Sequence, residues 1–388
     1  MKRSETTWFT PFNIVTTLIL LIGIPVCIYR FVGGLGAVTN LDDNNPFGIW
    51  IAFDVLTGVA LAAGGYTLGF VVYIFRMKEY HAVIRPAILT AFLGYTLVGI
   101  GLAFDVGRPW RMPYPFLVSQ GYTSVMFEVA ACVALYLTVL FLEFLPAVME
   151  WLRLRALRNF LVKLTVGLTI LGIVLSTLHQ SSLGSLFLIA KTKVHPLWYS
   201  SFLPMYFFVS SAVAGLSMVI FESSITHRAF KNIIDHEEES SFNHDKIVLG
   251  LGKAASIILF GYFGVKVLGV AHGDHWHLLS TGYGQWFLVE LLGFVLLPCF
   301  LYAIAVKKRL VGLVKLTSVI AVLGVVLNRF NLSLVAFNWK LPAADRYFPH
   351  IFEFIVSLTL VTGGLVAFKW IVTRMPILNE HPEFKGEH

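Results

Sequence analysis

Long apolar runs alternate with short polar segments along the whole chain. A membrane-spanning helix needs about 20 mostly apolar residues, and ten runs reach that length. They lie at residues 12–32, 49–75, 84–106, 122–149, 158–178, 202–226, 247–271, 285–306, 310–330 and 350–374. The loops leave no room for a soluble domain. The pattern therefore predicts an all-α integral membrane protein, with about ten transmembrane helices in one polytopic membrane domain, 1–388.

Small residues predict how these helices group. Stripes of small side chains let neighbouring helices approach closely in lipid. One clear stripe lies in the second span and a weaker one in the sixth: Gly58, Ala62, Gly65 and Gly69, then Ser211, Ala214 and Gly215. We expect two four-helix bundles, made by spans 2–5 (49–178) and spans 6–9 (202–330), with helices 12–32 and 350–374 at the periphery.

Composition agrees with the pattern. The 388 residues are 57% hydrophobic and 13% charged, whereas soluble domains carry about 25% charged residues. The net charge of +7 is therefore interpreted as loop asymmetry and not as nucleic-acid binding. Lysine and arginine favour the loops after even-numbered spans and both termini, which predicts cytoplasmic N- and C-termini in a bacterial inner membrane. The terminal basic residues are Lys2, Arg3, Arg374 and Lys385.

Ionisable residues inside the spans are the candidate functional residues, because charged groups are costly in lipid and usually serve a function. Asp54, Asp105, Glu128 and His179 fall at the outer ends of spans 2–5. Carboxylates and an imidazole at one depth are typical of a proton-coupled site. Two structural explanations stay open: Asp105 forms an ion pair with Arg108 that pins the turn, and Asp54 bonds to backbone.

A second polar group lies deeper. Tyr95 is in the middle of the third span, and Glu222 is near the inner end of the sixth. Glu143 follows Glu128 by 15 residues on one face of the fourth span, which is about 22 Å of helical rise. Tyr95, Glu143 and Glu222 are candidates for a proton relay. The alternative is that the two acids pair with the arginine-rich inner loops.

The sequence predicts no redox centre of its own. Cys27, Cys132 and Cys299 sit in apolar runs without metal-ligand spacing, so no iron–sulfur cluster is expected. The run 272–277, with three histidines and one aspartate, is interpreted as exposed surface, and no metal site is predicted. His179 is the only histidine in a predicted helical core, at a helix end, so no haem is expected. Any electron carrier must come from outside the chain.

Five motifs resemble those of the NrfD/polysulfide-reductase family of membrane subunits, and within it the branch that serves uptake nickel–iron hydrogenases. They are Asn-Pro-Phe-Gly-Ile-Trp (45–50), Asp-Val-Gly-Arg-Pro (105–109), Ser-Val-Met-Phe-Glu (124–128), His-Gln-Ser-Ser-Leu-Gly-Ser (179–185) and Val-His-Pro-Leu-Trp (194–198). The resemblance extends from the first predicted span to the last.

The resemblance implies a quinone-reactive subunit that passes electrons to menaquinone in a pocket formed by spans 2–5. It implies three kinds of partner: a periplasmic ferredoxin-like iron–sulfur subunit, the hydrogenase small and large subunits, and lipid. It also implies roles for the candidates. Those nearest the quinone are Tyr95, Glu128 and His179; those beside the pocket are Asp54, Asp105 and Arg108; and those on a proton path are Glu143 and Glu222.

Two other classes remain open from the sequence. A secondary transporter also carries buried acids and small-residue stripes, but such proteins usually show broken helices near the bilayer midplane. A passive membrane anchor would hold soluble subunits at the membrane, and it would have little need for Glu128 and His179.

Overall fold

The computed structural model describes residues 10–230 and 241–378, and nearly all of them are helical. Within these ranges ten helices are long and apolar enough to cross a membrane, which confirms the predicted fold class. The spans are Pro11–Gly33, Trp50–Ile74, Glu79–Asp105, Val125–Trp151, Arg155–Ile189, Leu203–Ala229, His244–His272, Gly282–Lys307, Val311–Val335 and Ile351–Arg374.

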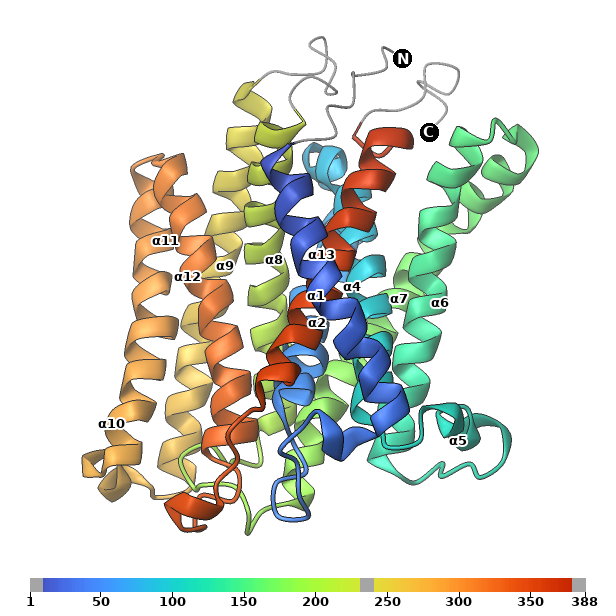
Figure 1. Ribbon diagram of the computed structural model, residues 1–388. Helices are drawn as coiled ribbons and strands as arrows, with labels where there is room; N and C mark the ends of the chain where they lie inside the picture. The colour runs from blue at the N-terminus through green and yellow to red at the C-terminus, as the bar shows by residue number, and fades with distance from the viewer. Residues whose placement is uncertain (1–9, 231–240, 379–388) are drawn as a thin grey trace.

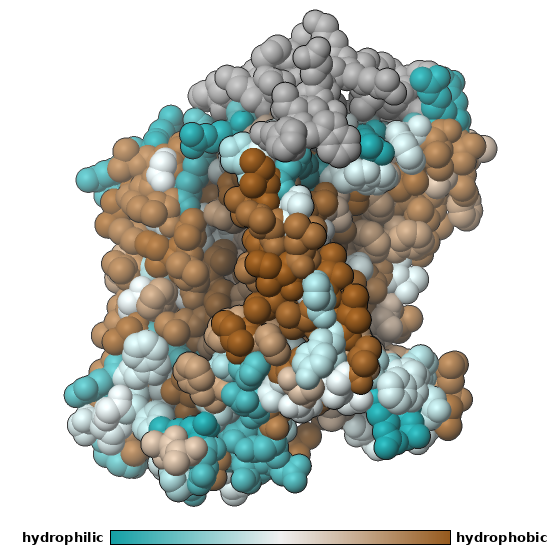
Figure 2. Space-filling view, viewed as in Figure 1, coloured by the Kyte–Doolittle hydropathy of each residue, from teal (hydrophilic) through white to brown (hydrophobic). Residues whose placement is uncertain are grey.

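Large apolar side chains form the outer belt of this molecule. Figure 2 shows a hydrophobic band around the middle height, with hydrophilic residues gathered toward both ends. This band has the distribution that a bilayer requires of a multi-pass protein. The first helix, α1 (Pro11–Gly33), starts at the end of the molecule where the last helix, α13 (Ile351–Arg374), finishes (Figure 1). The short helix α5 (Tyr114–Leu117) lies at the opposite end. Lys2, Arg3 and Lys385, used to predict the orientation, fall outside the described residues.

The spans pack as neighbours in two groups. In the first group α4 (Ile84–Asp105) contacts the second span and α6 (Val125–Trp151), which pairs with α7 (Arg155–Ile189). In the second group α8 (Leu203–Ala229) contacts α9 (Ser241–His272) and α12 (Val311–Phe330), and α11 (Leu297–Lys307) packs on both α9 and α12. Contacts of α8 with α7 and the second span join the groups, while α1 runs beside α13, which contacts α4 (Figure 1).

Close helix contacts use the small residues singled out in the second span. A Cβ added at Gly65 would lie 2.8 Å from the Cβ of Ala91 on α4, and one at Gly69 would lie 2.8 Å from Thr169 on α7. Real Cβ atoms need more room, so these glycines permit the separation at which the second span packs in the first group.

Several spans are not regular α-helices. The second span consists of π-helical η2 (Trp50–Thr57), α2 (Gly58–Leu61), α3 (Gly64–Gly69) and π-helical η3 (Phe70–Ile74). In the second group, π-helical η7 (Val289–Leu296) joins α10 (Gly282–Leu288) to α11, and η8 (Asn331–Val335) extends α12. Such segments occur often at functional sites. Here η2 carries Asp54 and η7 carries Glu290.

The predicted end of the fifth span at residue 178 is wrong. Helix α7 continues to Ile189 and is 35 residues long. The polar residues at this point bond within the helix: Ser181 donates to the carbonyl of Thr177, and Ser185 donates to the carbonyl of Ser181. Because hydroxyls satisfied in this way need no water, the polar stretch stays helical. His179 therefore lies within a helix and not at its end.

Candidate functional site

The centre of the first group holds a hydrogen-bonded tyrosine and histidine. Tyr95 of α4 and His179 of α7 are both fully buried, and the Tyr95 hydroxyl lies 2.5 Å from His179 Nε2. His179 Nδ1 lies 2.9 Å from the carbonyl of Leu175. A carbonyl only accepts, so Nδ1 carries a proton, and a single hydrogen is shared between Nε2 and the Tyr95 hydroxyl. The ring orientation is therefore fixed by hydrogen bonds at both nitrogens.

Unpartnered polar atoms surround this pair. The ring of Tyr136 on α6 lies 4.7 Å from that of Tyr95 and 5.7 Å from His179, measured between centroids. The Tyr136 hydroxyl, Ser176 Oγ and Gln180 Oε1 are buried without a hydrogen-bond partner in the part of the chain that the structure describes. Buried polar groups usually have partners, so this region is suited to hold water or a polar ligand. The sequence reasoning did not single out Tyr136, although a tyrosine in a predicted span was readable.

Glu128 reaches the same helix as His179 but not the imidazole itself. Its Oε1 accepts a 2.6 Å hydrogen bond from Ser182, one turn along α7. The side chain of Glu128 is exposed on the apolar outer surface, whereas His179 is enclosed. Glu128 and His179 were expected to form one centre. They instead lie about one helical turn apart along the α6–α7 interface.

Polar pairs continue along that interface. Glu143 on α6 accepts a 2.7 Å hydrogen bond from Thr169 on α7. Tyr136 is seven residues, or two turns, from Glu143 on α6, and Ser176 is seven residues from Thr169 on α7. Both therefore lie on the same helix faces as the Glu143–Thr169 pair. From Glu143 to Glu128 the series covers about 22 Å of α6. It is a discontinuous polar line through most of the membrane thickness.

The acids near the inner face differ in their partners. Glu150, which was not predicted, is fully buried and pairs with Arg85 at 2.9 Å and Arg158 at 3.0 Å. Glu143 bonds to Thr169 instead. Among the described residues, Glu222 Oε1 has no hydrogen-bond partner, and its side chain lines a small cavity between α4 and α8. The pairing with arginine that was considered for Glu143 and Glu222 is thus seen at Glu150.

Asp54 and Asp105 lie apart from the Tyr95–His179 pair. Asp54 is buried and accepts a 2.6 Å hydrogen bond from Ser357 of α13, not from backbone. Asp105 ends α4, where Arg30 of α1 donates to the carbonyls of Phe104 at 2.6 Å and of Val106 at 2.8 Å.

The considered ion pair between Asp105 and Arg108 is not present. Arg108 is exposed, and the cation whose charge acts on Asp105 is Arg30. Asp105 Oδ1 is buried without a hydrogen-bond partner. The outer end of α4 is therefore held by the first helix, which the sequence reasoning treated as peripheral.

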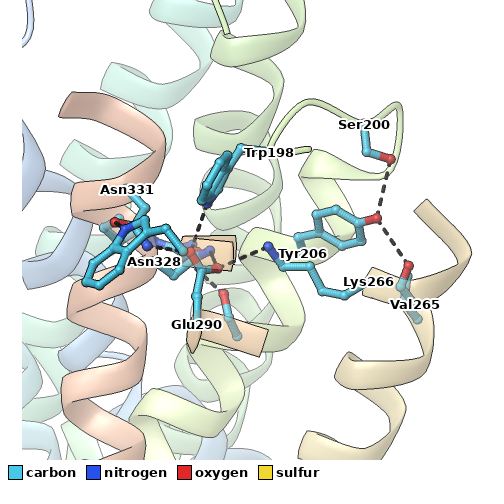
Figure 3. Close-up of polar contacts among 11 residues, drawn as sticks. Trp198, Ser200, Tyr206, Val265, Lys266, Glu290, Asn328 and Asn331 are labelled. Carbon is cyan, nitrogen blue, oxygen red and sulfur yellow. Dashed lines mark hydrogen bonds and ion pairs between the residues drawn. The ribbon is translucent and has the colours of Figure 1, made fainter. Parts of the chain in front are cut away.

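The second group contains a charged cluster that the sequence reasoning missed. Lys266 of α9 and Glu290 of η7 are buried and 3.4 Å apart (Figure 3). Arg329 of α12 is fully buried nearby. All three residues lie inside spans. Treating every ionisable residue within a span as a candidate would therefore have identified them as well.

A family model described as "Polysulphide reductase, NrfD" matches residues 37–337. A protein of Nitratidesulfovibrio vulgaris strain Hildenborough is 58% identical over 98% of this chain and 97% of its own length. The "Probable Ni/Fe-hydrogenase 2 b-type cytochrome subunit" of Escherichia coli K12 is 35% identical over 90% of this chain and 88% of its own.

A more distant relative carries a different name. The "Menaquinone reductase, integral membrane subunit" of N. vulgaris Hildenborough is 25% identical over 90% of this chain and 87% of its own length. The resemblance expected from the motifs is confirmed by these matches, which cover most of the chain.

Proposed function

This chain belongs to the polysulphide reductase NrfD family of integral membrane proteins, and on that premise we propose that it is the quinone-reactive subunit of a respiratory hydrogenase. In this proposal, electrons from an external iron–sulfur subunit reduce menaquinone with coupled proton uptake. The observation that carries the proposal is the buried Tyr95–His179 hydrogen bond, surrounded by unpartnered polar atoms. A proton donor and a proton acceptor fixed against each other are what quinone chemistry needs.

The names of two relatives support the choice of substrate and partners. One is named as a hydrogenase 2 subunit and the other as a menaquinone reductase subunit. We therefore propose a periplasmic ferredoxin-like iron–sulfur subunit docked on the outer face, with the hydrogenase small and large subunits beyond it. The chain would sit in a bacterial inner membrane with both termini in the cytoplasm.

Quinone would reach the site sideways from lipid. Glu128 is exposed in the first turn of α6. Phe116 of α5 and Tyr122 of the loop before α6 pack on Phe127 beside it. An exposed carboxylate next to aromatic surface offers a hydrogen-bonding end for the head group and an apolar wall for its tail. His179 lies one turn along α7 from Ser182, which bonds to Glu128.

Reduction balances when one quinone takes two electrons from the iron–sulfur partner and two protons through the polar line. Glu143 would receive protons from the inner side and pass them by way of Tyr136 and Ser176 toward Tyr95 and His179, with Glu222 as a second entry. Each charge moved against the membrane potential costs about 2.3 kcal/mol per 100 mV. Uptake from the outer side would instead make turnover electroneutral.

One observation favours a second candidate function, a secondary transporter. The second span is interrupted at Ala62 and Ala63, between α2 and α3, and interrupted spans are typical of transporters. That function would move protons or ions without any quinone. Proton flux in proteoliposomes lacking quinone and electron donor distinguishes it, because the proposed function predicts none.

The deciding experiment begins with the purified native complex. Bound quinone should co-purify with it, and hydrogen-dependent reduction of a menaquinone analogue should fall about 10²-fold in a Tyr95→Phe variant. A complex that reduces the analogue equally well with Tyr95→Phe would remove the pair from the mechanism. A complex that never retains or reduces quinone would instead favour a passive anchor.

A further inference from the structure

The segment between α4 and α6, residues 106–124, exposes large apolar and aromatic side chains. Trp110 is 69% exposed, Leu117 76% and Tyr122 79%. The segment holds its shape through bonds of its own; in α5, for example, the amide of Leu117 donates to the carbonyl of Pro113 at 3.1 Å. A contiguous exposed apolar surface marks a site that meets a membrane or another protein.

The length of α6 places this segment at the level of the lipid head groups. Helix α6 has 27 residues, which is about 40 Å of rise, whereas the hydrocarbon core of a bilayer is about 30 Å thick. The two ends of such a helix reach the head-group regions. Figure 1 shows α5 beside one end of α6, at the side of the helix bundle. The exposed side chains of the segment therefore lie where the bundle meets the membrane surface.

The surface of the segment continues onto the lipid-facing side of α6. Phe127, in the first turn of α6, contacts Phe116 and Tyr122, with ring centroids 6.1 and 5.4 Å apart. Ala134 and Phe141 follow Phe127 by 7 and 14 residues, so they lie on nearly the same face of the helix. Both are exposed. One apolar surface thus runs from the segment along the outside of α6.

The segment carries positive charge only. Residues 106–124 contain Arg108 and Arg111 and neither aspartate nor glutamate. Both arginines are exposed, and the guanidinium of Arg111 lies 5.6 Å from the centroid of the Tyr114 ring. Tryptophan and tyrosine are enriched at the membrane–water interface, and basic side chains beside them are attracted to anionic lipid.

We propose that the segment 106–124 lies in the membrane surface and binds anionic phospholipid head groups through Arg108 and Arg111. Its rings enter the boundary between head groups and acyl chains, and the guanidinium groups bind phosphate. Lipid is favoured over a protein partner because the segment lies at the side of the bundle and shares one apolar surface with a lipid-facing helix. This inference goes beyond quinone chemistry and does not depend on it.

Quenching of tryptophan fluorescence by brominated lipids tests the proposal on the full chain in nanodiscs. The nanodiscs contain phosphatidylcholine and phosphatidylglycerol, and one or the other carries bromine on its acyl chains, close to the head group. The emission of Trp110 is the difference between wild type and Trp110→Phe. We expect Trp110 to be quenched by both lipids, with a preference for phosphatidylglycerol of about fivefold for each arginine.

Two variants show whether the arginines cause this preference, each measured against its own Trp110→Phe counterpart. Arg111→Gln should lower the preference about fivefold. Lys340 is an exposed cation in the loop before α13, at the same end of the molecule, and Lys340→Gln should keep the wild-type preference. The proposal is overturned if neither lipid quenches Trp110, if both lipids quench it equally, or if Arg111→Gln keeps the wild-type preference.

The native complex provides the test against a protein partner. The same quenching of Trp110 is expected there, because lipid still covers the segment. Quenching that is present in the isolated chain and lost in the complex would also overturn the proposal, since another subunit would then cover residues 106–124.

Discussion

The Tyr95 hydroxyl points at His179 Nε2 from a different helix, 2.5 Å away and fully buried. The opposite nitrogen of the ring already donates to the Leu175 carbonyl, so protons on both nitrogens would make the ring a buried cation beside tyrosine. In the proposed function, reduction of a quinone would supply the negative charge that balances such a proton.

Tyr95→Phe is expected to destabilise the chain as well as slow turnover. It leaves His179 Nε2 buried without a donor, which costs about 1–3 kcal/mol. Denaturation of the purified chain measures the loss of stability, and reduction of a menaquinone analogue by the complex measures the loss of turnover. Tyr302→Phe, which removes the bond to Ser217 in the second group, should lose stability alone.

Glu128→Gln should preserve assembly and abolish quinone reduction. The new amide oxygen can still accept from Ser182, so the α6–α7 contact remains while the ionisable group is lost. The measurement pairs gel filtration of the complex with hydrogen-dependent reduction. Glu79→Gln, which removes the exposed ion pair with Lys246, is the control for losing a carboxylate. Unimpaired reduction by Glu128→Gln would exclude this carboxylate from the reaction.

Glu143→Gln and Thr169→Val should reduce proton uptake from the inner side more than they reduce electron transfer. Both changes interrupt the polar line at its inner end. Proteoliposomes containing the complex report protons taken up per electron. Thr138→Val removes only a bond to its own helix at Ala134 and should leave this ratio unchanged. Identical ratios in all of these proteins would point to uptake from the outer side.

An absorption spectrum of the isolated subunit should lack the intense Soret band of haem. A relative is named as a b-type cytochrome subunit, yet His179 has both ring nitrogens in hydrogen bonds and offers no free ligand to iron. A Soret band that disappears in a His179→Gln variant would show that the imidazole exchanges these bonds for a metal.

Acid should destabilise the loops between α7 and α8 through His195. Burial, and to a smaller extent the charge of His275, lowers the pKa of His195 to about 4. The unfolded chain binds a proton near pH 6.5, so this contribution to stability is present above pH 6.5 and is lost as pH falls toward 4. His195→Phe keeps a ring against Tyr283 and should flatten the dependence of Tm on pH in that range. An unchanged profile would place the titration elsewhere.

The spans were predictable because their apolar length is local information, whereas the site depends on how helices turn toward each other. Tyr95 and His179 were both singled out, but they were assigned to different depths. The error followed from ending α7 at residue 178, where serines bonded to their own helix resemble a loop. The pairing of Lys266 with Glu290 needs the rotation of α9 against η7, which periodicity alone does not supply.

The partner of Asp54 comes from a helix outside the region that the family model covers. Ser357 donates to its carboxylate and the Glu353 carbonyl accepts from Trp50, yet the match ends at residue 337. The surroundings of this acid are therefore completed by a helix that lies beyond the family match, although the relative from N. vulgaris Hildenborough that is 58% identical covers 98% of the chain. Exchanging residues of this helix between relatives would change the surroundings of one carboxyl group and leave the matched region intact.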